Sequence, residues 1–274
     1  MNAEPPPFGT FAPTPMQQTI IGLCQSGPLA GILRRGTFRR PLSRLVARLR
    51  SGPVDVERGP LRYRLDVADN AVEVGLLLDP HYQRASIRFV TERLPQCGTL
   101  VDCGANVGQF ALAGLIATSA GGRVVAVEAT ENPLNRLRAN AALSGLADRL
   151  TIVPCAVGDS DGELRFSVNA RDTALSKADA AGNVVVPMKS LLSICRESGL
   201  TRIDVLKIDV EGMEDRVLAA FFASAPESLW PSAICLEDEL AHLWAEDIRP
   251  VLAGCGYRAL PERSKGNVFL VREA

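Results

Sequence analysis

From residue 61 onward the sequence predicts an α/β protein in which helices cover both faces of a parallel sheet. Two observations predict this fold. Short apolar, strand-like segments alternate with longer helix-like segments. In addition, one strand runs directly into a glycine-rich turn and a helix, as is typical of doubly wound sheets. The chain has 274 residues, of which 47% are hydrophobic and 22% charged, so it can bury a core without disulfides and is not of the disordered class.

The expected strands are rich in Val, Leu and Ile, and the helices fit between them. The strands cover residues 61–67, 99–103, 123–128, 150–154, 203–209 and 233–237, with a closing pair at 257–260 and 267–271. The clearest helices cover residues 108–118, 132–143, 189–197, 213–223 and 245–255. Residues 162–186 hold two short strands and a polar stretch, 169–183, which is either a lid over a bound substrate or a plain surface loop.

The first 55 residues are expected to form a separate basic arm, and residues 56–274 a single domain. Residues 1–30 are rich in proline, which lacks a backbone donor and resists helix formation, so this part is expected to be mobile. The charges divide in the same way. Residues 1–60 carry eight Arg against three acidic residues, which is +5, although the net charge of the whole chain is −1.

Residues 34–50 predict a basic amphipathic helix. Seven Arg fall in this segment, and Leu42, Leu45, Val46 and Leu49 have the i, i+3, i+4, i+7 spacing of one apolar stripe. Such a helix either lies on the protein's own body with its Arg side chains in water, or contacts an anionic membrane surface or an acidic partner. We expect no nucleic-acid partner.

The sequence predicts a cytoplasmic protein with reduced thiols. No stretch reaches 18 apolar residues, and the start lacks a basic region followed by an apolar one, so neither a membrane span nor a secretion signal is expected. The seven Cys are odd in number, form no Cys-x-x-Cys motif and mostly lie in apolar runs.

Residues 99–108 have the features of a ligand-binding turn. A strand ends at Cys103 and is followed by Gly104-Ala-Asn106-Val-Gly108 at the start of a helix. Glycine lets the backbone approach a ligand and adopt positive φ, and asparagine is the non-glycine residue best suited to the left-handed region. A dinucleotide fingerprint needs glycine at the third and sixth positions, which are Asn106 and Gln109 here, so a pyrophosphate ligand is disfavoured.

Glu128 ends the next strand, about 20 residues downstream, where a carboxylate can accept hydrogen bonds from both hydroxyls of a ribose. Alternatively, it is a solvated residue at a strand end or a negative charge near the N-terminus of the following helix. The turn and Glu128 follow each other in the order that a nucleoside site requires, and together they predict nucleoside binding.

Several segments together resemble the FkbM family of methyltransferases. They are Val-Asp-Cys-Gly-Ala-Asn-Val-Gly at 101–108, Glu128 with Asn132-Pro and Asn140, Ala-Val-Gly at 156–158, Leu-Lys-Ile-Asp-Val-Glu-Gly-Met-Glu at 206–214, and Gly256-Tyr257. The resemblance covers about residues 99–271 and implies the class I, Rossmann-like methyltransferase fold, a seven-stranded sheet whose last two strands form an antiparallel hairpin. It also implies S-adenosylmethionine as methyl donor and oxygen as acceptor, commonly in a hydroxyl of a sugar or another natural product.

The resemblance also implies the parts of a cofactor site. The methionine part of the cofactor would be surrounded by Asp102, Gly104, Asn106 and Gly108. Glu128 would bind the ribose, and Ala156 and Val157 would lie near adenine. Cys103 departs from the Val or Ile that the family more often has. The segment from Glu237 has no uniform counterpart in the family, so substrate contacts there do not carry over.

The strand at 203–209 and the residues after it carry Lys207, Asp209 and Glu211 at period two, which would share one face of an extended chain. A buried lysine needs a charged partner, which Asp209 or Glu211 would supply. The structural alternative is a buried ion pair together with an Asp that caps the helix beginning near Met213. A functional role is favoured because ligands of open α/β sheets bind at the C-terminal ends of the strands.

Methyl transfer to a hydroxyl requires a protein that aligns the acceptor oxygen and manages its proton. An alcohol is not ionised at pH 7, so a carboxylate or imidazole takes the proton as the bond forms, or a bound cation lowers the pKa of the hydroxyl. We expect Asp209 to be the base, with Glu211 as second choice. Alternatively, Asp209, Glu211 and Glu237 bind Mg²⁺ through their oxygen atoms, and the spacing does not separate a base from a ligand.

Two histidines are further candidates for substrate contact or proton transfer. His81 precedes the first core strand and lies either over the pocket or in a surface turn. His242 follows the strand at 233–237. The acidic run at 237–239 can also be no more than solvated surface charge.

The sequence thus predicts an S-adenosylmethionine-dependent O-methyltransferase that acts on a small molecule or glycan. Two other classes stay open at this point. One is an NAD-dependent oxidoreductase, and the other is a non-catalytic nucleoside-binding adaptor that acts through its Arg-rich helix.

Overall fold

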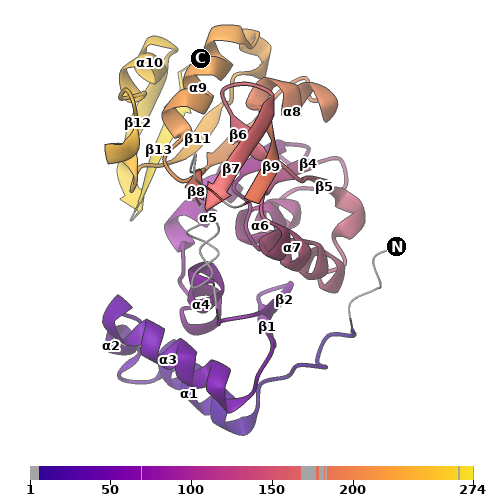
Figure 1. Cartoon of the computed structure of the whole chain (residues 1–274), viewed down its shortest axis with the longest axis vertical. Coiled ribbons are helices and arrows are strands. Elements are labelled where there is room, and N and C mark those ends of the chain that lie inside the picture. Colours follow the sequence, from indigo (N-terminus) through magenta and orange to yellow (C-terminus); the bar gives the residue numbers. More distant parts are fainter. Residues whose placement is uncertain are drawn as a thin grey trace.

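The fold is built around one large sheet (Figure 1). The computed structural model describes residues 6–68, 70–167, 177–178, 182, 184–264 and 266–273. The sheet has seven strands in the order β12-β13-β11-β10-β3-β4-β5. In chain order they are β3 (Thr99–Cys103), β4 (Arg123–Val127), β5 (Leu150–Val153), β10 (Val205–Ile208), β11 (Ala233–Glu237), β12 (Tyr257–Ser264) and β13 (Asn267–Arg272).

The strand directions confirm the predicted doubly wound sheet. β5, β4, β3, β10 and β11 are parallel to their neighbours, whereas β13 pairs antiparallel with both β11 and β12. Strands β3 and β11 have the bounds that the sequence predicts, and the others differ from their predicted bounds at one or both ends. The predicted closing pair at the C-terminal end is therefore an antiparallel hairpin.

Helices cover both faces of this sheet. One face packs against α5 (Arg84–Arg93), α6 (Gln109–Ala117) and α7 (Glu131–Leu143), and the other against α8 (Leu191–Glu197), α9 (Glu214–Ser224) and α10 (Arg249–Gly254). Side chains of β3 alternate between the two layers, because Leu100 belongs to the first core cluster and Val101 to the second. Strands buried on both faces explain the near-continuous apolar runs in the sequence.

Helix α10 begins later than expected. The sequence predicts a helix over residues 245–255, but α10 starts at Arg249. The backbone N–H groups of Ala245 and Glu246 instead donate to Oδ2 of Asp215, at 2.7 and 3.3 Å, and Pro250 occupies the first turn of the helix, where its missing N–H is tolerated. The prediction for residues 245–248 is therefore wrong.

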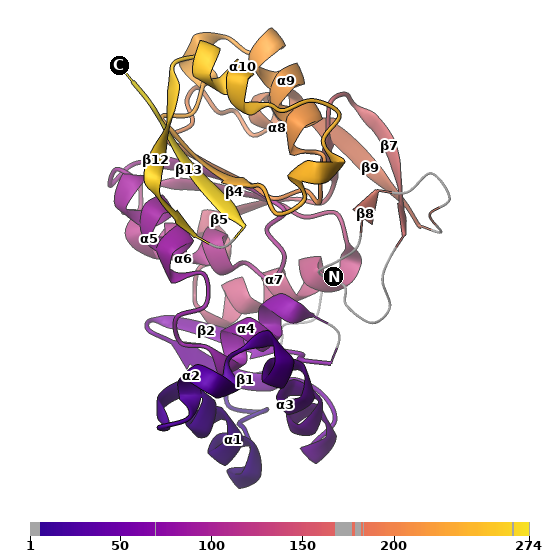
Figure 2. The same ribbon diagram turned by 90° about the vertical axis from the view of Figure 1, so that its left-hand side faces the viewer.

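The N-terminal residues are more ordered than their proline content predicts. They form α1 (Pro15–Ser26), α2 (Ala30–Leu33) and α3 (Gly36–Leu49), followed by β1 (Val54–Arg58), β2 (Leu61–Leu65) and α4 (Ala71–Leu78). Figures 1 and 2 show α1, α2 and α3 together at the end of the molecule opposite α9 and α10.

Helix α1 contradicts the expectation that residues 1–30 resist helix formation. Pro15 stands at the start of the helix, where a proline costs no hydrogen bond. Thr14 and Gln17 form a capping box, in which each side chain accepts from the backbone N–H of the other. Ile21 and Cys24 are buried in the same core cluster as the helices under the sheet, so this helix is tied to the rest of the chain.

The boundary predicted between residues 55 and 56 falls inside β1. This strand pairs antiparallel with β2, and the buried carboxylate of Asp55 binds the guanidinium of Arg64 at 2.8 Å. The division into an arm and a domain stays a prediction, but its two parts share a β-ladder and a buried ion pair.

Helix α3 bears out the helix predicted at 34–50, although its apolar stripe is divided. Val46 is fully buried and Leu42 is partly buried, so one side of the helix lies on the protein's own body. Leu45, by contrast, is 44% exposed.

A second, smaller sheet lies beside the large one. It consists of β6 (Ala156–Gly158), β7 (Gly162–Ser167), β8 (Lys177–Ala178) and β9 (Val184–Ser190), in the order β6-β9-β7-β8. The two short strands expected within 162–186 are β7 and the start of β9. The polar stretch 169–183, predicted as a lid or a loop, lies almost wholly outside the described residues. Among the described helices, none combines the length and the apolar character of a membrane span.

Candidate active site

An open cleft lies at the C-terminal edge of the parallel strands, where ligands of open α/β sheets bind. Its walls are the turn after β3, the end of β4, the segment that begins β6 and the segment after β10. Eight of the residues predicted from the sequence line it: Gly104, Asn106, Glu128, Ala156, Val157, Lys207, Asp209 and Glu211.

The turn after β3 has the backbone conformation that its sequence predicts. Gly104, Asn106 and Gly108 all have positive φ, of +75°, +48° and +94°. A Cβ atom on Gly104 would lie 1.9 Å from the carbonyl oxygen of Asp209, and one on Gly108 would lie 2.5 Å from a methyl group of Leu137. A side chain is therefore excluded at Gly104, where it would meet backbone, and at Gly108 the positive φ disfavours one.

Hydrogen bonds hold this turn against β4 and α4. The backbone N–H groups of Gly104 and Ala105 both donate to the carbonyl oxygen of Val127, at 3.0 and 2.9 Å. The side-chain oxygen of Asn106 accepts from Nδ2 of Asn70 at 2.9 Å, and Asn70 in turn caps α4. The N-terminal part of the chain thus contacts the turn directly.

Asn140 belongs to the segments that resemble the family, and the sequence predicts no role for it. In the structure it holds the turn after β3 in place. Its fully buried side chain donates to the carbonyl oxygen of Val107 at 3.0 Å and accepts from the backbone N–H of Arg64 at 2.8 Å. It therefore links the turn to β2.

Glu128 is held rigidly at the edge of the cleft. Its Oε1 accepts from the backbone N–H and the hydroxyl of Thr130, at 2.8 and 2.6 Å, and its Oε2 accepts from the backbone N–H of Asn106 at 2.9 Å. The residue is only 8% exposed. Because a carboxylate oxygen has two lone pairs, Oε2 keeps one acceptor position for a ligand hydroxyl.

An apolar wall continues from Glu128. It is made by Cys155, Ala156, Val157 and Leu164. The flat face of a nucleobase buries well against such a surface, which agrees with the role that the resemblance implies for Ala156 and Val157.

Lys207 and Asp102 form a buried pair beneath the cleft. They are register partners on β10 and β3, with Nζ 3.6 Å from Oδ1, and their side chains are 3% and 0% exposed. Lys207 also donates to the carbonyl oxygen of Gly104 at 2.9 Å. Burial alone would lower the pKa of Lys207, but the nearby carboxylates of Asp209 and Asp102 outweigh it and raise this pKa above its usual value.

Asp102 does not line the cleft. Neither of its oxygens has a hydrogen-bond partner among the described residues, and burial raises its pKa despite the opposing charge of Lys207. Its position suits an indirect role, in which it holds Lys207, and direct contact with a cofactor stays a prediction.

The sequence predicts that Asp209 and Glu211 share one face of an extended strand. The structure contradicts this prediction. β10 ends at Ile208, and Glu211 has φ of +59°, so the chain turns sharply between them. Both still line the cleft, and Oδ2 of Asp209 lies 3.4 Å from Nζ of Lys207. Burial and then the charge of Asp209 raise the pKa of Glu211 to about 8.

Glu214 is a functional candidate that sequence reasoning missed. Its Oε1 accepts from the backbone N–H groups of Val210 and Gly212, at 2.7 and 3.2 Å, and its Oε2 accepts from Nε1 of Trp244 at 2.9 Å. The expected Asp cap near Met213 is absent from α9, whose N-cap residue makes no side-chain hydrogen bond. An acidic residue in the first turn of a helix was the available signal.

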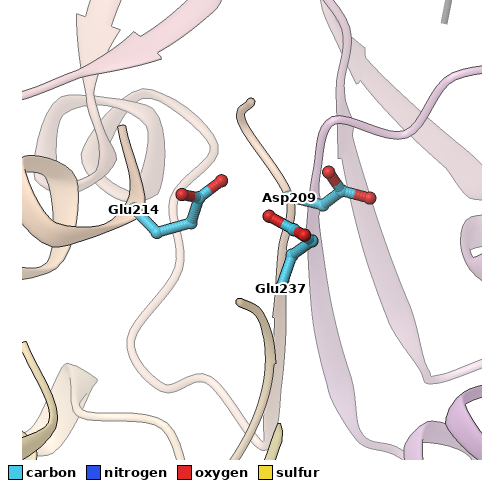
Figure 3. Close-up of side chains that lie close together, drawn as sticks. All are labelled: Asp209, Glu214 and Glu237. Carbon is cyan, nitrogen blue, oxygen red and sulfur yellow. The ribbon is translucent and has the colours of Figure 1, made fainter. Parts of the chain in front are cut away.

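Glu214 completes a group of three carboxylates, shown in Figure 3, that we call the acidic cluster: Asp209, Glu214 and Glu237. One oxygen of each lies within 4.8 Å of the other two. Burial and the charge of Asp209 raise the pKa of Glu237 to about 8. The metal set predicted from the sequence shares Asp209 and Glu237 with this cluster, but Glu214 takes the position expected for Glu211.

Neither histidine reaches the cleft. His81 is exposed in a surface turn, where its backbone N–H donates to Asp79 at 2.9 Å. His242 is exposed in the short 3₁₀ helix Ala241–Leu243. These positions agree with the surface alternative rather than with contact to a bound substrate.

Further residues that line the cleft have no role predicted from the sequence. They are Val72, Gln83, Gln109, Phe110, Thr130 and Met213. Val72 and Gln83 precede the segment that carries the resemblance, so the sequence gives no reason to associate them with the site.

The strand order, with an antiparallel hairpin after five parallel strands and a glycine-rich turn at their C-terminal edge, defines a class I methyltransferase fold. Residues 102–259, more than half of the chain, match the model of the methyltransferase FkbM domain. The protein therefore belongs to the FkbM family of methyltransferases.

Several solved structures resemble the fold. A methyltransferase FkbM from Methylobacillus flagellatus is 18% identical, with a TM-score of 0.43, over 63% of this chain but only 42% of the other. A methyltransferase from Geobacter sulfurreducens is 15% identical, with a TM-score of 0.47, over 90% and 93% of the two chains. An O-methyltransferase from Bacillus cereus in complex with SAH is 15% identical, with a TM-score of 0.44, over 89% and 95%. Comparison with curated proteins finds no match.

Proposed function

We propose that the protein transfers a methyl group from S-adenosylmethionine to a hydroxyl of a sugar, a glycan or another small natural product. The observation that carries the proposal is that Glu128 and Asp209 line the same cleft. One carboxylate is fixed where a nucleoside would bind, and the other stands at the end of the neighbouring strand, where an acceptor would approach.

The residues of the cleft fit this cofactor. Glu128 keeps an acceptor position for a ribose hydroxyl, and the apolar wall of Cys155, Ala156 and Val157 suits adenine. The turn residues Gly104, Ala105 and Asn106 line the cleft, so the methionine part could lie against their backbone. The carboxylate of Asp209 at this end of the cleft favours a cationic ligand.

When bound, the cofactor supplies a methyl group that is already activated on a sulfonium, so the protein must orient the acceptor oxygen and accept its proton. Asp209 is 34% exposed and borders the cleft, so its carboxylate can reach the proton of a bound hydroxyl. Lys207 orients the carboxylate of Asp209, because its Nζ lies 3.4 Å from Oδ2. Glu211 stands in the same cleft and is the second candidate for the base.

Binding of S-adenosylhomocysteine, measured by calorimetry, is the first test. Micromolar affinity is expected, with a loss of about tenfold or more in Glu128→Gln, because a hydrogen-bonded charged acceptor is removed. Glu131→Gln changes an exposed acid three residues away and should bind like the wild type. No binding by the folded wild type would rule out the proposal.

A methyl-transfer screen with labelled cofactor then identifies the acceptor. Extracts are fractionated into glycan, lipid and small-metabolite pools, and label should appear in the glycan or small-metabolite pool. Label on nitrogen in the isolated product would refute the O-methyl assignment. Hydride transfer on addition of NAD would favour an oxidoreductase instead.

A further inference from the structure

We propose that the acidic cluster of Asp209, Glu214 and Glu237 binds one divalent cation of the class that prefers oxygen ligands, such as Mg²⁺, Mn²⁺ or Ca²⁺. The three side chains come from the residue after β10, the start of α9 and the end of β11, and Figure 3 shows them close together. Three carboxylate oxygens within 4.8 Å of one another are the ligand type that these cations favour.

An independent observation at Glu237 points to a missing partner. This residue is 8% exposed, and its Oε1 accepts from the backbone N–H of Glu239 at 2.5 Å. Its Oε2 is buried and has no hydrogen-bond partner among the residues that the structure describes. A buried carboxylate oxygen without a partner is costly, and a cation between Glu237 and its neighbours removes that cost.

The charges around the acidic cluster are not balanced by basic side chains of the described residues. Lys207 pairs with Asp209, but in the described part of the chain no basic side chain forms an ion pair with Glu214 or Glu237. Lys207 is also committed to Asp102 and to the carbonyl oxygen of Gly104. A divalent cation would balance the two carboxylates that Lys207 does not reach.

Glu214 is held in the orientation that a ligand needs. Two backbone N–H groups use both lone pairs of its Oε1, and Nε1 of Trp244 uses one lone pair of its Oε2. One lone pair of Oε2 is left for a cation, and the donors around the carboxylate fix its position, as is usual around metal ligands.

The spacing of the oxygens bears on the ion. Ligands on opposite sides of Ca²⁺ are about 4.6–5.2 Å apart, and those of Mg²⁺ about 4.0–4.2 Å apart. The oxygens of the acidic cluster lie within 4.8 Å of one another, and this upper limit admits an ion of either size.

Its place in the reaction rests on the proposed function. Asp209 belongs both to the cluster and to the lining of the cleft, so a cation held there lies where an acceptor hydroxyl would approach. A bound cation would lower the pKa of that hydroxyl and so ease its deprotonation.

Titration of the chelator-treated full chain with MnCl₂, followed by calorimetry and by the paramagnetic signal of free Mn²⁺, tests the site without any methyl transfer. One saturable equivalent is expected, with affinity lowered about tenfold or more in Glu237→Gln and in Asp209→Asn. Glu92→Gln, which changes an exposed acid on α5, should bind like the wild type. Mn²⁺ should also raise the Tm of the wild type but not that of Glu237→Gln.

Either of two results overturns the cation site: no saturable binding to folded wild type, or undiminished binding by a folded Glu237→Gln variant. Binding of S-adenosylhomocysteine is measured on the same samples. Its failure with intact Mn²⁺ binding would refute the proposed function alone, and the reverse pattern would refute the cation site alone.

A separate surface, the outer face of α3, carries a second proposal. Phe38, Pro41 and Leu45 follow i, i+3, i+7 spacing on the exposed side of the helix, and Arg44 and Arg48 are exposed beside them. Phe38 and Leu45 are 45% and 44% exposed, although both are large apolar residues. We infer that this face binds the surface of a membrane that contains anionic lipids.

The surroundings of α3 favour a lipid surface as the occupant. Six of the eleven large apolar side chains that are exposed in the described part of the chain lie between residues 16 and 45. The segment 34–50 has seven Arg and no acidic residue, so its charge complements anionic headgroups while the apolar side chains enter the interface. Figures 1 and 2 show α1, α2 and α3 at one end of the molecule, where a flat bilayer can approach them.

Sedimentation of the full chain with vesicles tests this inference. Binding is expected to vesicles of phosphatidylcholine with one third phosphatidylglycerol and not to phosphatidylcholine alone. At about 1 kcal/mol per basic residue, Arg44→Gln should weaken binding about fivefold, and Phe38→Ser should weaken it as well. Val251→Ser, which changes an equally exposed apolar residue on α10, should have no effect. Absence of vesicle binding, or binding to polyglutamate instead, would overturn the lipid assignment.

Discussion

Gly104 and Asp209 touch through their backbones, since a Cβ atom on the glycine would lie 1.9 Å from the carbonyl oxygen of the aspartate. The turn that faces the nucleoside side of the cleft therefore also supports the segment that carries the acidic residues. A change in one is transmitted to the other without passing through a side chain.

Gly104→Ala should destabilise the protein and abolish cofactor binding. The added methyl group meets a carbonyl oxygen rather than a flexible side chain, and φ of +75° adds strain of about 1–3 kcal/mol. Urea unfolding and calorimetry with S-adenosylhomocysteine measure the two effects. Gly162→Ala is the control, because nothing lies within 4 Å of its Cβ position. Equal stability and affinity in the two variants would contradict the close packing of the turn.

Asp209→Asn should leave the affinity for S-adenosylhomocysteine nearly unchanged and lower methyl transfer about 10²–10⁴-fold, because a general base is lost. Steady-state assays with labelled cofactor measure the effect, with the exposed Asp159→Asn as control. If Glu211 is the base instead, Glu211→Gln loses turnover and Asp209→Asn retains it. Turnover near that of the wild type in both variants would exclude a base role for either residue.

Lys207→Met should cost about 3–5 kcal/mol of stability, since it leaves the fully buried Asp102 without its cation. Adding Asp102→Asn should restore part of that loss, and a double-mutant cycle from urea unfolding measures the coupling. Lys189→Met breaks the exposed pair with Glu197 and should lower the stability far less. Additive effects of the two buried substitutions would show that Lys207 and Asp102 are not coupled.

Glu211 should make the protein less stable as the pH rises. Its pKa is about 8 in the folded state against 4.5 ordinarily, so the native state retains a proton that the unfolded chain releases. The stabilisation is complete below about pH 4.5 and is lost as the pH rises to about 8. In chelator-treated protein, Glu211→Gln should therefore flatten the decline in unfolding free energy between pH 5.5 and 7.5. An unchanged slope, equal to that of Glu92→Gln, would speak against the raised pKa.

The parts of the site that the sequence predicts are those fixed by local pattern. Thr99–Cys103 and Ala233–Glu237 have the bounds expected from their apolar runs. Asp209 follows β10 and Glu237 is the last residue of the neighbouring parallel strand β11, so topology alone brings them to one edge. The positive φ of Gly104 and Asn106 follows from the turn residues.

The parts that the sequence does not predict depend on how distant segments meet. Glu214 joins the acidic cluster because the chain turns sharply at Glu211, which has positive φ. Glycine and asparagine indicate positive φ in a sequence, whereas a glutamate does not. The sequence does not predict helix α1, because proline disfavours a helix at most positions, whereas Pro15 stands at the start, where it is compatible with one. Val72 reaches the cleft through tertiary packing alone.

The order of strands in the large sheet has a consequence for biosynthesis. β13 is the last strand of the sheet in sequence, yet it lies between β11 and β12, so the edge of β11 that carries Glu237 stays bare until residue 272 has left the ribosome. Until β13 has been made, a nascent chain therefore presents an unpaired, apolar strand edge, and such edges recruit chaperones or other chains.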